Sequence, residues 1–177
     1  MVKEFKYPAD YRAAMGTSYA FWPHCKRHLS SFLFWGRLYE ASSNRIVRKV
    51  SAFIVRQMAK RNGNEIAFNG NIGAGLILAH GRNITINSRS IVGSNCVFFK
   101  GCTIGSIRSG RREGVPCIGN RVVVGCNAFV CGGIKIGDDV LIAANAFVDF
   151  DVPPNSVVIG NPGVVHHKEN PCKDYLH

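Results

Sequence analysis

The most regular feature of this sequence is an aliphatic residue at every sixth position of its second half. A second small or aliphatic residue stands four positions after each of these. The members of the first set are Ile118, Val124, Val130, Ile136, Ile142 and Val148. A period of six fits neither the 3.6-residue period of an amphipathic helix nor the alternation of a simple strand. It is typical of a solenoid whose turns are built from short strands and tight corners.

The same period can be followed upstream. The residues spaced by six there are Phe68, Ala74, His80, Ile86, Val92, Phe98 and Ile104. The step from Ile104 to Ile118 is fourteen residues, two more than a multiple of the six-residue period. The segment between them is rich in Gly and Arg. We therefore predict that residues 105–117 form a loop that leaves the solenoid.

The period also predicts how such a solenoid is built. Successive coils stack as parallel strands about 4.8 Å apart, so inward residues must be aliphatic and corner residues small. Each coil buries itself only against its neighbours, and both ends of the stack need a cap. We predict coils over residues 64–153, because Pro153 and Pro154 should end strand pairing. The C-terminal tail is then 154–177.

Residues 1–63 differ in pattern and in charge. They carry twelve Lys/Arg and three Asp/Glu, whereas residues 64–177 carry ten and eight. Apolar residues at helical spacing predict a helix that starts after Ser43 or Asn44 and stops at Asn62-Gly63. An earlier helix should cover much of residues 24–39. The apolar face of the later helix comprises Ile46, Val47, Val50, Phe53, Ile54 and Met58.

Two interpretations of this basic helical segment stay open. Its apolar face can pack on the solenoid or on another subunit, or it can lie on an anionic membrane surface. Nucleic acid is disfavoured because no nucleic-acid-binding motif is present. The chain shows no apolar stretch long enough to span a membrane and no signal-peptide core, so we expect a cytoplasmic protein, with peripheral contact at the inner face of the membrane as one option.

The seven cysteines and six histidines predict no metal site. No two cysteines form a C-x-x-C pair, and no Cys/His cluster has the spacing of metal ligands. Reduced thiols that pack as small apolar side chains are the simpler interpretation.

Three segments of the repeat resemble the hexapeptide-repeat acyltransferases, and within them the serine acetyltransferase branch. These segments are Gly75–Gly81, Gly101–Gly105, and Asp151–Pro153 with Gly160–Gly163. The short helical N-terminus is similar in layout to the capsule and exopolysaccharide O-acetyltransferases of that branch. The resemblance implies a mainly β fold, a left-handed parallel β-helix of hexapeptide repeats. It also implies a homotrimer with acetyl-CoA between neighbouring solenoids, and the N-terminal helices can add a larger assembly.

His80 matches the catalytic histidine of this family. Taken alone, a histidine in an apolar frame is more often a hydrogen-bonded structural residue. The resemblance instead makes His80 a general base that takes the proton of an acceptor hydroxyl during direct acetyl transfer. Backbone N–H groups of the glycine-bearing corners can then stabilise the oxyanion.

The resemblance assigns further residues to the cofactor and the acceptor. Gly105 and Ser106 match positions along the pantetheine arm, and Ala143, Ala144 and Asn145 match a small-residue corner that lets the cofactor approach. Lys168 follows the segment in which the family often has a basic residue. For the acceptor or the CoA phosphates, the candidates are Lys100 and the loop cations Arg108, Arg111 and Arg112. A solvated loop without a ligand is the alternative for the three arginines.

Two departures from the serine acetyltransferase pattern bear on the acceptor. Ala79 stands where the branch has Asp, and Val115-Pro116 replaces its His-Pro pair. We therefore predict transfer of acetyl from acetyl-CoA to a hydroxyl of a sugar or a surface-polysaccharide precursor. The alternatives are a serine O-acetyltransferase and a non-catalytic trimeric scaffold. A three-histidine metalloenzyme on this fold is disfavoured because the coils contain only His80.

Overall fold

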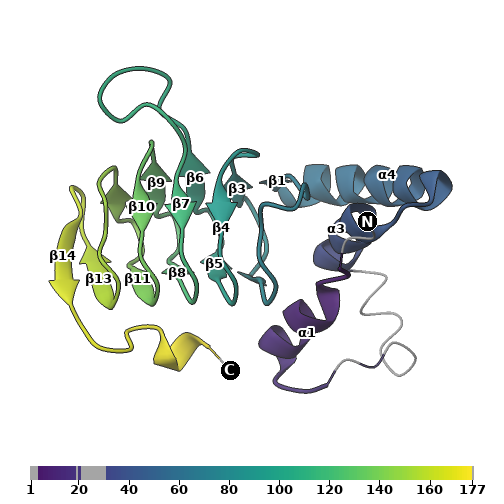
Figure 1. The fold of residues 1–177 in the computed structure, drawn as a ribbon, viewed down its shortest axis with the longest axis horizontal. Coiled ribbons are helices and arrows are strands. Elements are labelled where there is room, and N and C mark those ends of the chain that lie inside the picture. Colours follow the sequence, from purple (N-terminus) through teal and green to yellow (C-terminus); the bar gives the residue numbers. More distant parts are fainter. Residues whose placement is uncertain (1–3, 19, 21–30, 177) are drawn as a thin grey trace.

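The computed structural model describes residues 4–18, 20 and 31–176. Helices stand at one end of a stack of β coils, and a short C-terminal segment runs back along the stack (Figure 1). The helices are α1 (Tyr7–Met15), α3 (Phe32–Ala41), α4 (Arg45–Asn62) and the 3-10 helix η2 (Lys173–Tyr175). The strands are β1 (Glu65–Ile66), β2 (Ile77–Ala79), β3 (Thr85–Ile86), β4 (Ile91–Val92), β5 (Val97–Phe99), β6 (Thr103–Gly105), β7 (Cys117–Ile118), β8 (Val123–Val124), β9 (Phe129–Cys131), β10 (Lys135–Ile136), β11 (Val140–Ile142), β12 (Phe147–Val148), β13 (Ser156–Ile159) and β14 (Val164–His167).

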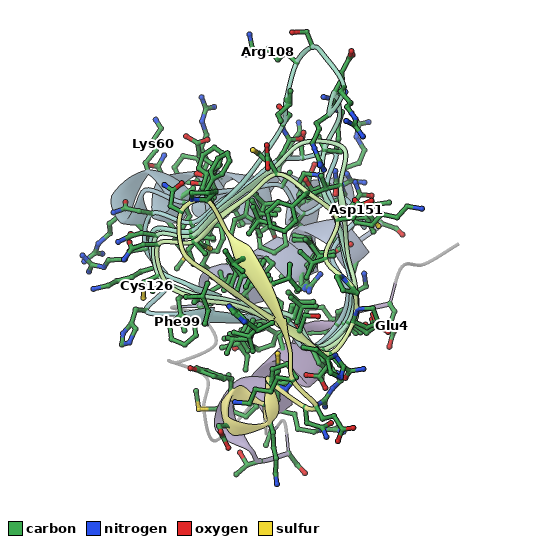
Figure 2. The ribbon with its side chains drawn as sticks, turned by 90° about the vertical axis from the view of Figure 1, so that its left-hand side faces the viewer. Glu4, Lys60, Phe99, Arg108, Cys126 and Asp151 are labelled. Atoms are coloured by element: carbon green, nitrogen blue, oxygen red, sulfur yellow. The ribbon has the colours of Figure 1, made fainter. Side chains whose placement is uncertain are left out.

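The strands form three sheets that wrap around a common core. The first sheet has the order β1-β3-β6-β9-β12, the second β4-β7-β10, and the third β2-β5-β8-β11-β13-β14. Every pair is parallel except β13 with β14. Viewed along the stack, the coils have a triangular outline (Figure 2). Ile86 pairs with Ile104, eighteen residues on, so a regular coil is three hexads, as the repeat predicts.

The interior of the coils is one narrow aliphatic column. Its members include Ile86, Val92, Phe98, Ile104, Ile118, Val124, Val130, Ile136, Ile142 and Val148, all buried. Cys96 and Cys102 fill small-residue positions of this column, and burial raises the pKa of each thiol to about 12. The thiols therefore pack as small apolar side chains.

Three coils depart from eighteen residues. Leu78 pairs with Phe98, a step of twenty, whereas the step from Ile104 to Val130 is twenty-six and from Ile142 to Val158 is sixteen. The long coil contains the predicted loop, which connects β6 to β7.

The step of twenty corrects the predicted frame of the first coil. Its inward residues are Ile66, Ile72 and Leu78, so the frame through Phe68, Ala74 and His80 is two residues out of phase. His80 is exposed at a corner and does not belong to the interior column.

The prediction that the two prolines end strand pairing is wrong. Pro153 and Pro154 lie at a corner between the second and third sheets, where no ladder hydrogen bond needs their missing N–H. Asn155 takes a left-handed φ of 54°, and β13 then pairs in parallel with β11. The parallel stack therefore continues to Ile159, past the predicted end at residue 153, and β14 folds back on it.

The predicted ends of α4 are confirmed. The Asn44 side chain accepts hydrogen bonds from the N–H groups of Ile46 and Val47, and Gly63 ends the helix with a φ of 69°. α3 covers the second part of the helix predicted over residues 24–39, and residues 24–30 lie outside the described part of the chain. The helix α1 is additional to the prediction.

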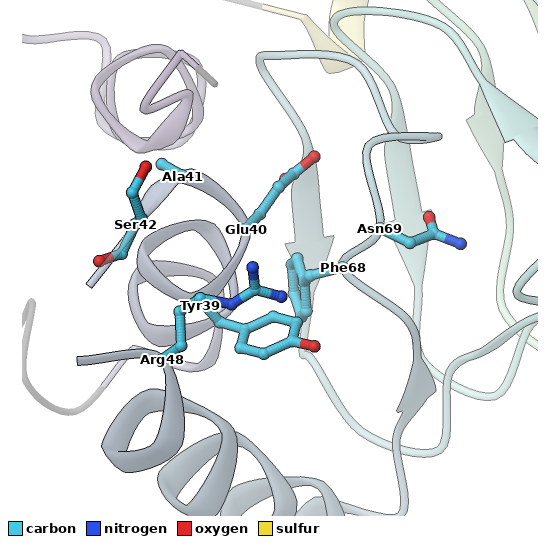
Figure 3. Close-up of a pocket in the computed structure, with 8 residues that line it drawn as sticks. Tyr39, Glu40, Ala41, Ser42, Arg48, Phe68 and Asn69 are labelled. Carbon is cyan, nitrogen blue, oxygen red and sulfur yellow. The ribbon is translucent and has the colours of Figure 1, made fainter. Parts of the chain in front are cut away.

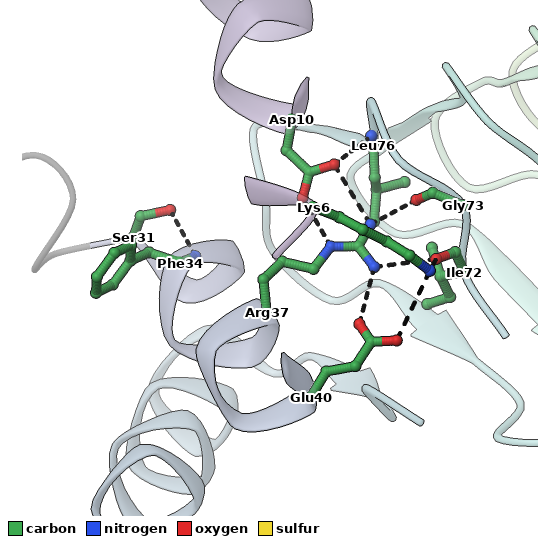
Figure 4. Close-up of polar contacts among 9 residues, drawn as sticks. All are labelled: Lys6, Asp10, Ser31, Phe34, Arg37, Glu40, Ile72, Gly73 and Leu76. Atoms are coloured by element: carbon green, nitrogen blue, oxygen red, sulfur yellow. Dashed lines mark hydrogen bonds and ion pairs between the residues drawn. The ribbon is translucent and has the colours of Figure 1, made fainter. Parts of the chain in front are cut away.

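A buried charged cluster joins the helices to the first coil (Figure 4). Arg37, which is 1% exposed, donates to Asp10 Oδ2 at 2.8 Å and to the carbonyl oxygens of Ile72 at 3.0 Å and Gly73 at 2.6 Å. Asp10 also accepts the N–H of Leu76 at 2.8 Å. Burial raises the pKa of Asp10, and the hydrogen bonds from Arg37 oppose that shift. The cluster thus pairs backbone groups at the open end of the stack.

Arg37→Ala should lower the free energy of unfolding by about 3–5 kcal/mol, because it removes the cation that pairs with the buried Asp10 carboxylate and the side-chain donor to the Gly73 carbonyl. Urea denaturation followed by circular dichroism measures this loss. The matched control, Arg12→Ala, removes an exposed cation of α1 and should change stability by no more than about 0.5 kcal/mol. Equal midpoints for the two variants would contradict a capping role for Arg37.

Candidate active site

The candidate site lies at the corner where the third sheet passes into the first. Successive coils place Arg82, Lys100, Cys126 and Ala144 above one another along this corner. The N–H of Gly101 donates to the Arg82 carbonyl at 3.1 Å, that of Asn127 to Lys100 at 3.1 Å and that of Asn145 to Cys126 at 2.9 Å. The corner therefore begins with two neighbouring cations and ends in small residues.

His80 and Gly81 are the two extra residues of the first coil. If they are left out, Arg82 and Asn83 fall at the places that Lys100 and Gly101 occupy in the next coil. Both extra residues have left-handed φ values, 58° for His80 and 26° for Gly81. The Gly81 N–H donates to the Leu78 carbonyl at 3.2 Å, and the Asn64 side chain donates to the Gly81 carbonyl at 2.8 Å.

These two residues form a bulge, the His80–Gly81 bulge, which exposes the His80 imidazole to solvent at the edge of the coil. A left-handed residue with a side chain costs on the order of 1–2 kcal/mol, and such residues persist where the surroundings fix them. Residues held in this way cluster at functional sites. Within the described part of the chain, no hydrogen bond or ion pair holds the His80 ring, so one chain alone does not orient it.

An apolar hollow of about 250 Å³ adjoins the same corner. Ala143 and Ala144 leave it open because their side chains are small, and Phe99 and Tyr175 form walls whose rings meet edge to face at 6.0 Å. Figure 2 shows Phe99 and Cys126 close together at this corner. Sequence reasoning missed Arg82, Phe99 and Tyr175. Arg82 becomes visible once the two-residue insertion is recognised, whereas the irregular tail gives no signal for Tyr175.

Gly105 and Ser106 lie at a different corner, where the first sheet passes into the second. They line a shallow hollow of about 520 Å³ on the outer face of the first sheet, together with Thr85 and Ser88. One chain therefore does not bring these two predicted cofactor residues to His80.

The three loop arginines are also outside the His80 corner. The loop is closed at its root by two hydrogen bonds of 3.0 Å between Ile107 and Gly114, and Arg108 lies at its tip (Figure 2). Arg108 and Arg111 are exposed, and Arg112 is half-buried with its carbonyl accepting the Gly133 N–H. Val115 follows Gly114 at the root of this loop. It therefore lies at a different corner of the coil from His80.

Lys168 lies at the third corner. Because β14 runs antiparallel to β13, the chain returns to the start of β13, where the Lys168 N–H donates to the Asn155 carbonyl. Ala143–Asn145 lie at the opposite end of the third sheet. The proposed cofactor role of Lys168 therefore stays a prediction that this chain by itself does not support.

Ala79 leaves the His80 bulge without a neighbouring carboxylate. Its side chain packs with Phe99 against Val97 and Val123 on the outer face of the third sheet. Among the residues that the structure describes, no group of three or more His, Cys, Asp or Glu lies together as metal ligands would, and six cysteines are free.

Comparisons with known proteins agree with this architecture. A serine acetyltransferase of Synechococcus elongatus is 39% identical over 116 residues, which is 64% of this chain and 47% of that protein. One from Helicobacter pylori is 37% identical over 113 residues, 62% of this chain and 66% of that protein. The crystal structure of Neisseria gonorrhoeae serine acetyltransferase superposes with a TM-score of 0.62 at 28% identity, covering 80% of this chain and 53% of that one. No family model matches the chain.

These similarities and the parallel sheets confirm the predicted fold class, a mainly β left-handed parallel β-helix behind a short α-helical segment. The chain is thus similar in sequence and fold to serine acetyltransferases, which resemble it in the way expected of hexapeptide-repeat acyltransferases. Within that family, the relatives described above are serine acetyltransferases, so they do not support the narrower resemblance to capsule and exopolysaccharide enzymes. The chain spans about half to two thirds of the length of these relatives.

Deletion of His80 and Gly81 should leave a folded chain with an eighteen-residue first coil, because every neighbouring corner closes without such a bulge. The free energy of unfolding should stay within about 1 kcal/mol of the parent protein. Deleting Gly101 and Cys102 instead removes a left-handed glycine and a buried side chain, and should cost at least about 3 kcal/mol. Thermal and urea unfolding compare the two, and equal losses would show that the bulge is part of the coil.

Proposed function

We propose that this protein is an acetyl-CoA-dependent O-acetyltransferase with His80 as its general base. The observation that carries the proposal is the His80–Gly81 bulge, which exposes an imidazole at the same corner that an apolar hollow of the following coils adjoins, on a scaffold similar to serine acetyltransferases. A surface loop that only turns a corner does not need two extra left-handed residues, since the neighbouring corners use one each.

The proposed chemistry is direct transfer. As the acceptor hydroxyl oxygen attacks the thioester carbonyl, the His80 imidazole takes the hydroxyl proton. The tetrahedral intermediate then collapses, the carbon–sulfur bond breaks, and the imidazolium returns its proton to the thiolate of CoA. Nearby backbone N–H groups supply the oxyanion with donors. No covalent enzyme intermediate and no metal is needed.

The hollow beside Ala143 and Ala144 is the proposed place of the pantetheine arm, because small side chains leave room for an extended chain against the sheet. Its lining is apolar, which suits the alkyl and thioester portion of the arm better than the phosphates. Asn145 turns the adjacent corner. The phosphates of CoA need cations, which Arg108, Arg111 and Arg112 of the loop provide.

A homotrimer would bring together the two groups of proposed site residues that lie apart in one chain, the His80 corner and the Gly105–Ser106 corner. In a threefold assembly, the Gly105–Ser106 corner of one subunit lies beside the His80 corner of the next, so the cofactor is bound between them. The exposed aromatic stack on the outer face of the first sheet supports this arrangement. Phe129 is 43% exposed and stacks on Phe147 with ring centroids 5.9 Å apart. Exposed aromatic pairs of this kind are typical of interface cores.

L-serine is the proposed acceptor, because the named relatives at 37–39% identity are serine acetyltransferases. A sugar hydroxyl is the second candidate. It is favoured by Ala79 and Val115, which stand where the serine acetyltransferase pattern has a carboxylate and a second imidazole. The cations Arg82 and Lys100 suit an acceptor that carries a negative charge, the serine carboxylate or an anionic sugar.

His80→Asn should lower the rate of acetyl transfer by about 10²–10⁴-fold while leaving CoA affinity unchanged, because Asn tolerates a left-handed φ but does not take a proton near neutral pH. Acetyl-CoA consumption is measured with L-serine in one series and a panel of monosaccharides and nucleotide sugars in another. The control is Lys135→Ala on the second sheet, which should keep full activity.

The outcomes separate the candidates. Turnover with L-serine that is lost in His80→Asn supports the first acceptor, and turnover with a sugar alone supports the second. Activity retained in His80→Asn would contradict the proposed base. CoA binding without turnover on any acceptor would favour the non-catalytic scaffold.

Ala144→Phe should weaken CoA binding by at least about tenfold, because the ring fills the hollow that the pantetheine arm needs. Isothermal titration calorimetry with CoA measures the change. Ala14→Phe, on the exposed side of α1, is the matched control and should bind CoA as the parent does. Unchanged affinity in Ala144→Phe would move the cofactor away from this hollow.

A further inference from the structure

The helix α4 carries an apolar stripe on the face that points away from the protein. Ile46 is 74% exposed, Val50 48% and Phe53 63%. Spacings of four and three residues place these side chains in one row along the helix. The apolar face predicted for α4 is therefore only partly used to pack the protein. Three large apolar side chains in one row are more than the scattered exposed leucines and valines of an ordinary surface.

Contacts on the opposite side of α4 hold the helix so that this stripe faces away from the protein. The opposite side of α4 contacts the core through Val55, Met58 and Ala59. The Arg48 guanidinium lies over the Tyr39 ring at 5.0 Å from its centroid and ties α4 to α3 (Figure 3). α4 also projects past β1 beyond the end of the coil stack (Figure 1). The stripe therefore does not meet the coils of its own chain.

Cations border the stripe, and the helix has no acidic residue. Exposed basic residues lie along one side of it. They are Arg45, Lys49, Arg56 and Lys60. α4 also contains Arg48 and Arg61 and no Asp or Glu. None of the ion pairs formed by the described residues involves this helix. Its charge is therefore available to an external partner.

Charge decides which partner suits this face. Two copies of α4 face to face would bring two sets of six cations together with no carboxylate between them, which opposes self-association. A nucleic acid would satisfy the cations but would leave Ile46 and Phe53 in water. The surface of an anionic bilayer matches both features, because lipid phosphates accept the cations and the interfacial region accepts the apolar side chains.

We propose that α4 is an interfacial helix that binds the surface of an anionic lipid bilayer. Ile46, Val50 and Phe53 enter the boundary between headgroups and acyl chains, while Lys49 and Lys60 lie at the level of the phosphates. The helix lies on the membrane; within the described residues no helix is long and apolar enough to cross one. This proposal does not rest on the acetyl-transfer activity, since it uses none of the residues of the His80 corner.

Vesicle co-sedimentation of the full chain tests the proposal. One set of vesicles is phosphatidylcholine alone and the other is phosphatidylcholine mixed with phosphatidylglycerol. The protein should pellet with the mixed vesicles and be released by high salt. Lys49→Ala and Lys60→Ala should each weaken binding by about fivefold, the equivalent of about 1 kcal/mol per cation. Lys135→Ala, an exposed lysine of the coils, is the charge-matched control and should bind as the parent does.

The apolar stripe is tested separately by Phe53→Ser and Ile46→Ser, which change exposed residues and should fold. Both should lower binding to the mixed vesicles at least as much as a lost cation. Equal pelleting with the two vesicle types, or none with either, would overturn the proposal. So would a fall in molecular mass by light scattering in Phe53→Ser without lipid, because the stripe would then be a contact between copies. Binding to duplex DNA that Phe53→Ser leaves unchanged, together with no lipid binding, would identify a simple polycation surface.

Discussion

The structure depends on a fixed number of residues per coil. Each turn of the column accepts one aliphatic side chain per strand, and neighbouring coils must match these positions to complete their backbone hydrogen bonds. Eighteen residues satisfy both conditions, as in the pairing of Ile86 with Ile104. Extra residues therefore have no place inside and must leave at a corner. The His80–Gly81 bulge and the loop of residues 105–117 are the two insertions, and both carry the chain's candidate chemistry.

A stack of this kind has two open ends, and the two are closed by different means. At the end of the stack, β14 pairs antiparallel with β13 and the tail packs over the third sheet. At the start, Arg37 pairs with Asp10 and with carbonyl groups of the first coil, so the helical segment is joined to the coils by hydrogen bonds as well as by apolar packing. A buried ion pair of this kind adds little net stability relative to apolar packing, but removing one of its partners is strongly destabilising. Because the helices are held in this way, the direction in which α4 presents its outer face is fixed as well.

The fold was predictable from the sequence because its signal repeats many times, and the site was less so because its signal occurs once. A dozen hexads define the column even where one is misaligned. A two-residue shift in a single coil, however, moved His80 from the interior to a corner, and periodicity alone offers no landmark within the first coil. The predicted end of strand pairing at Pro153 and Pro154 was wrong for a similar reason. A proline interrupts a hydrogen-bond ladder only inside a strand, and the sequence does not show where a corner of the coil lies. The sequence did not predict that half of the α4 apolar face is exposed, because helical periodicity identifies an apolar side without showing whether another element covers it.

The separation of the predicted site residues among three corners follows from the geometry of a triangular coil. Residues that follow one another by a hexad must lie on different edges, so a site that uses both the end of the third sheet and the end of the first cannot close within one chain. The His80 side chain has no hydrogen-bond partner among the described residues, and Gly105 and Ser106 lie on another edge. A threefold assembly whose site is shared between two subunits is expected to have this arrangement. A solenoid of this shape gains a cleft only when a second solenoid lies beside it, since each of its faces is nearly flat. In this architecture, assembly is therefore a condition for the proposed chemistry, and the exposed Phe129–Phe147 stack on the first sheet is the surface that we propose for the contact.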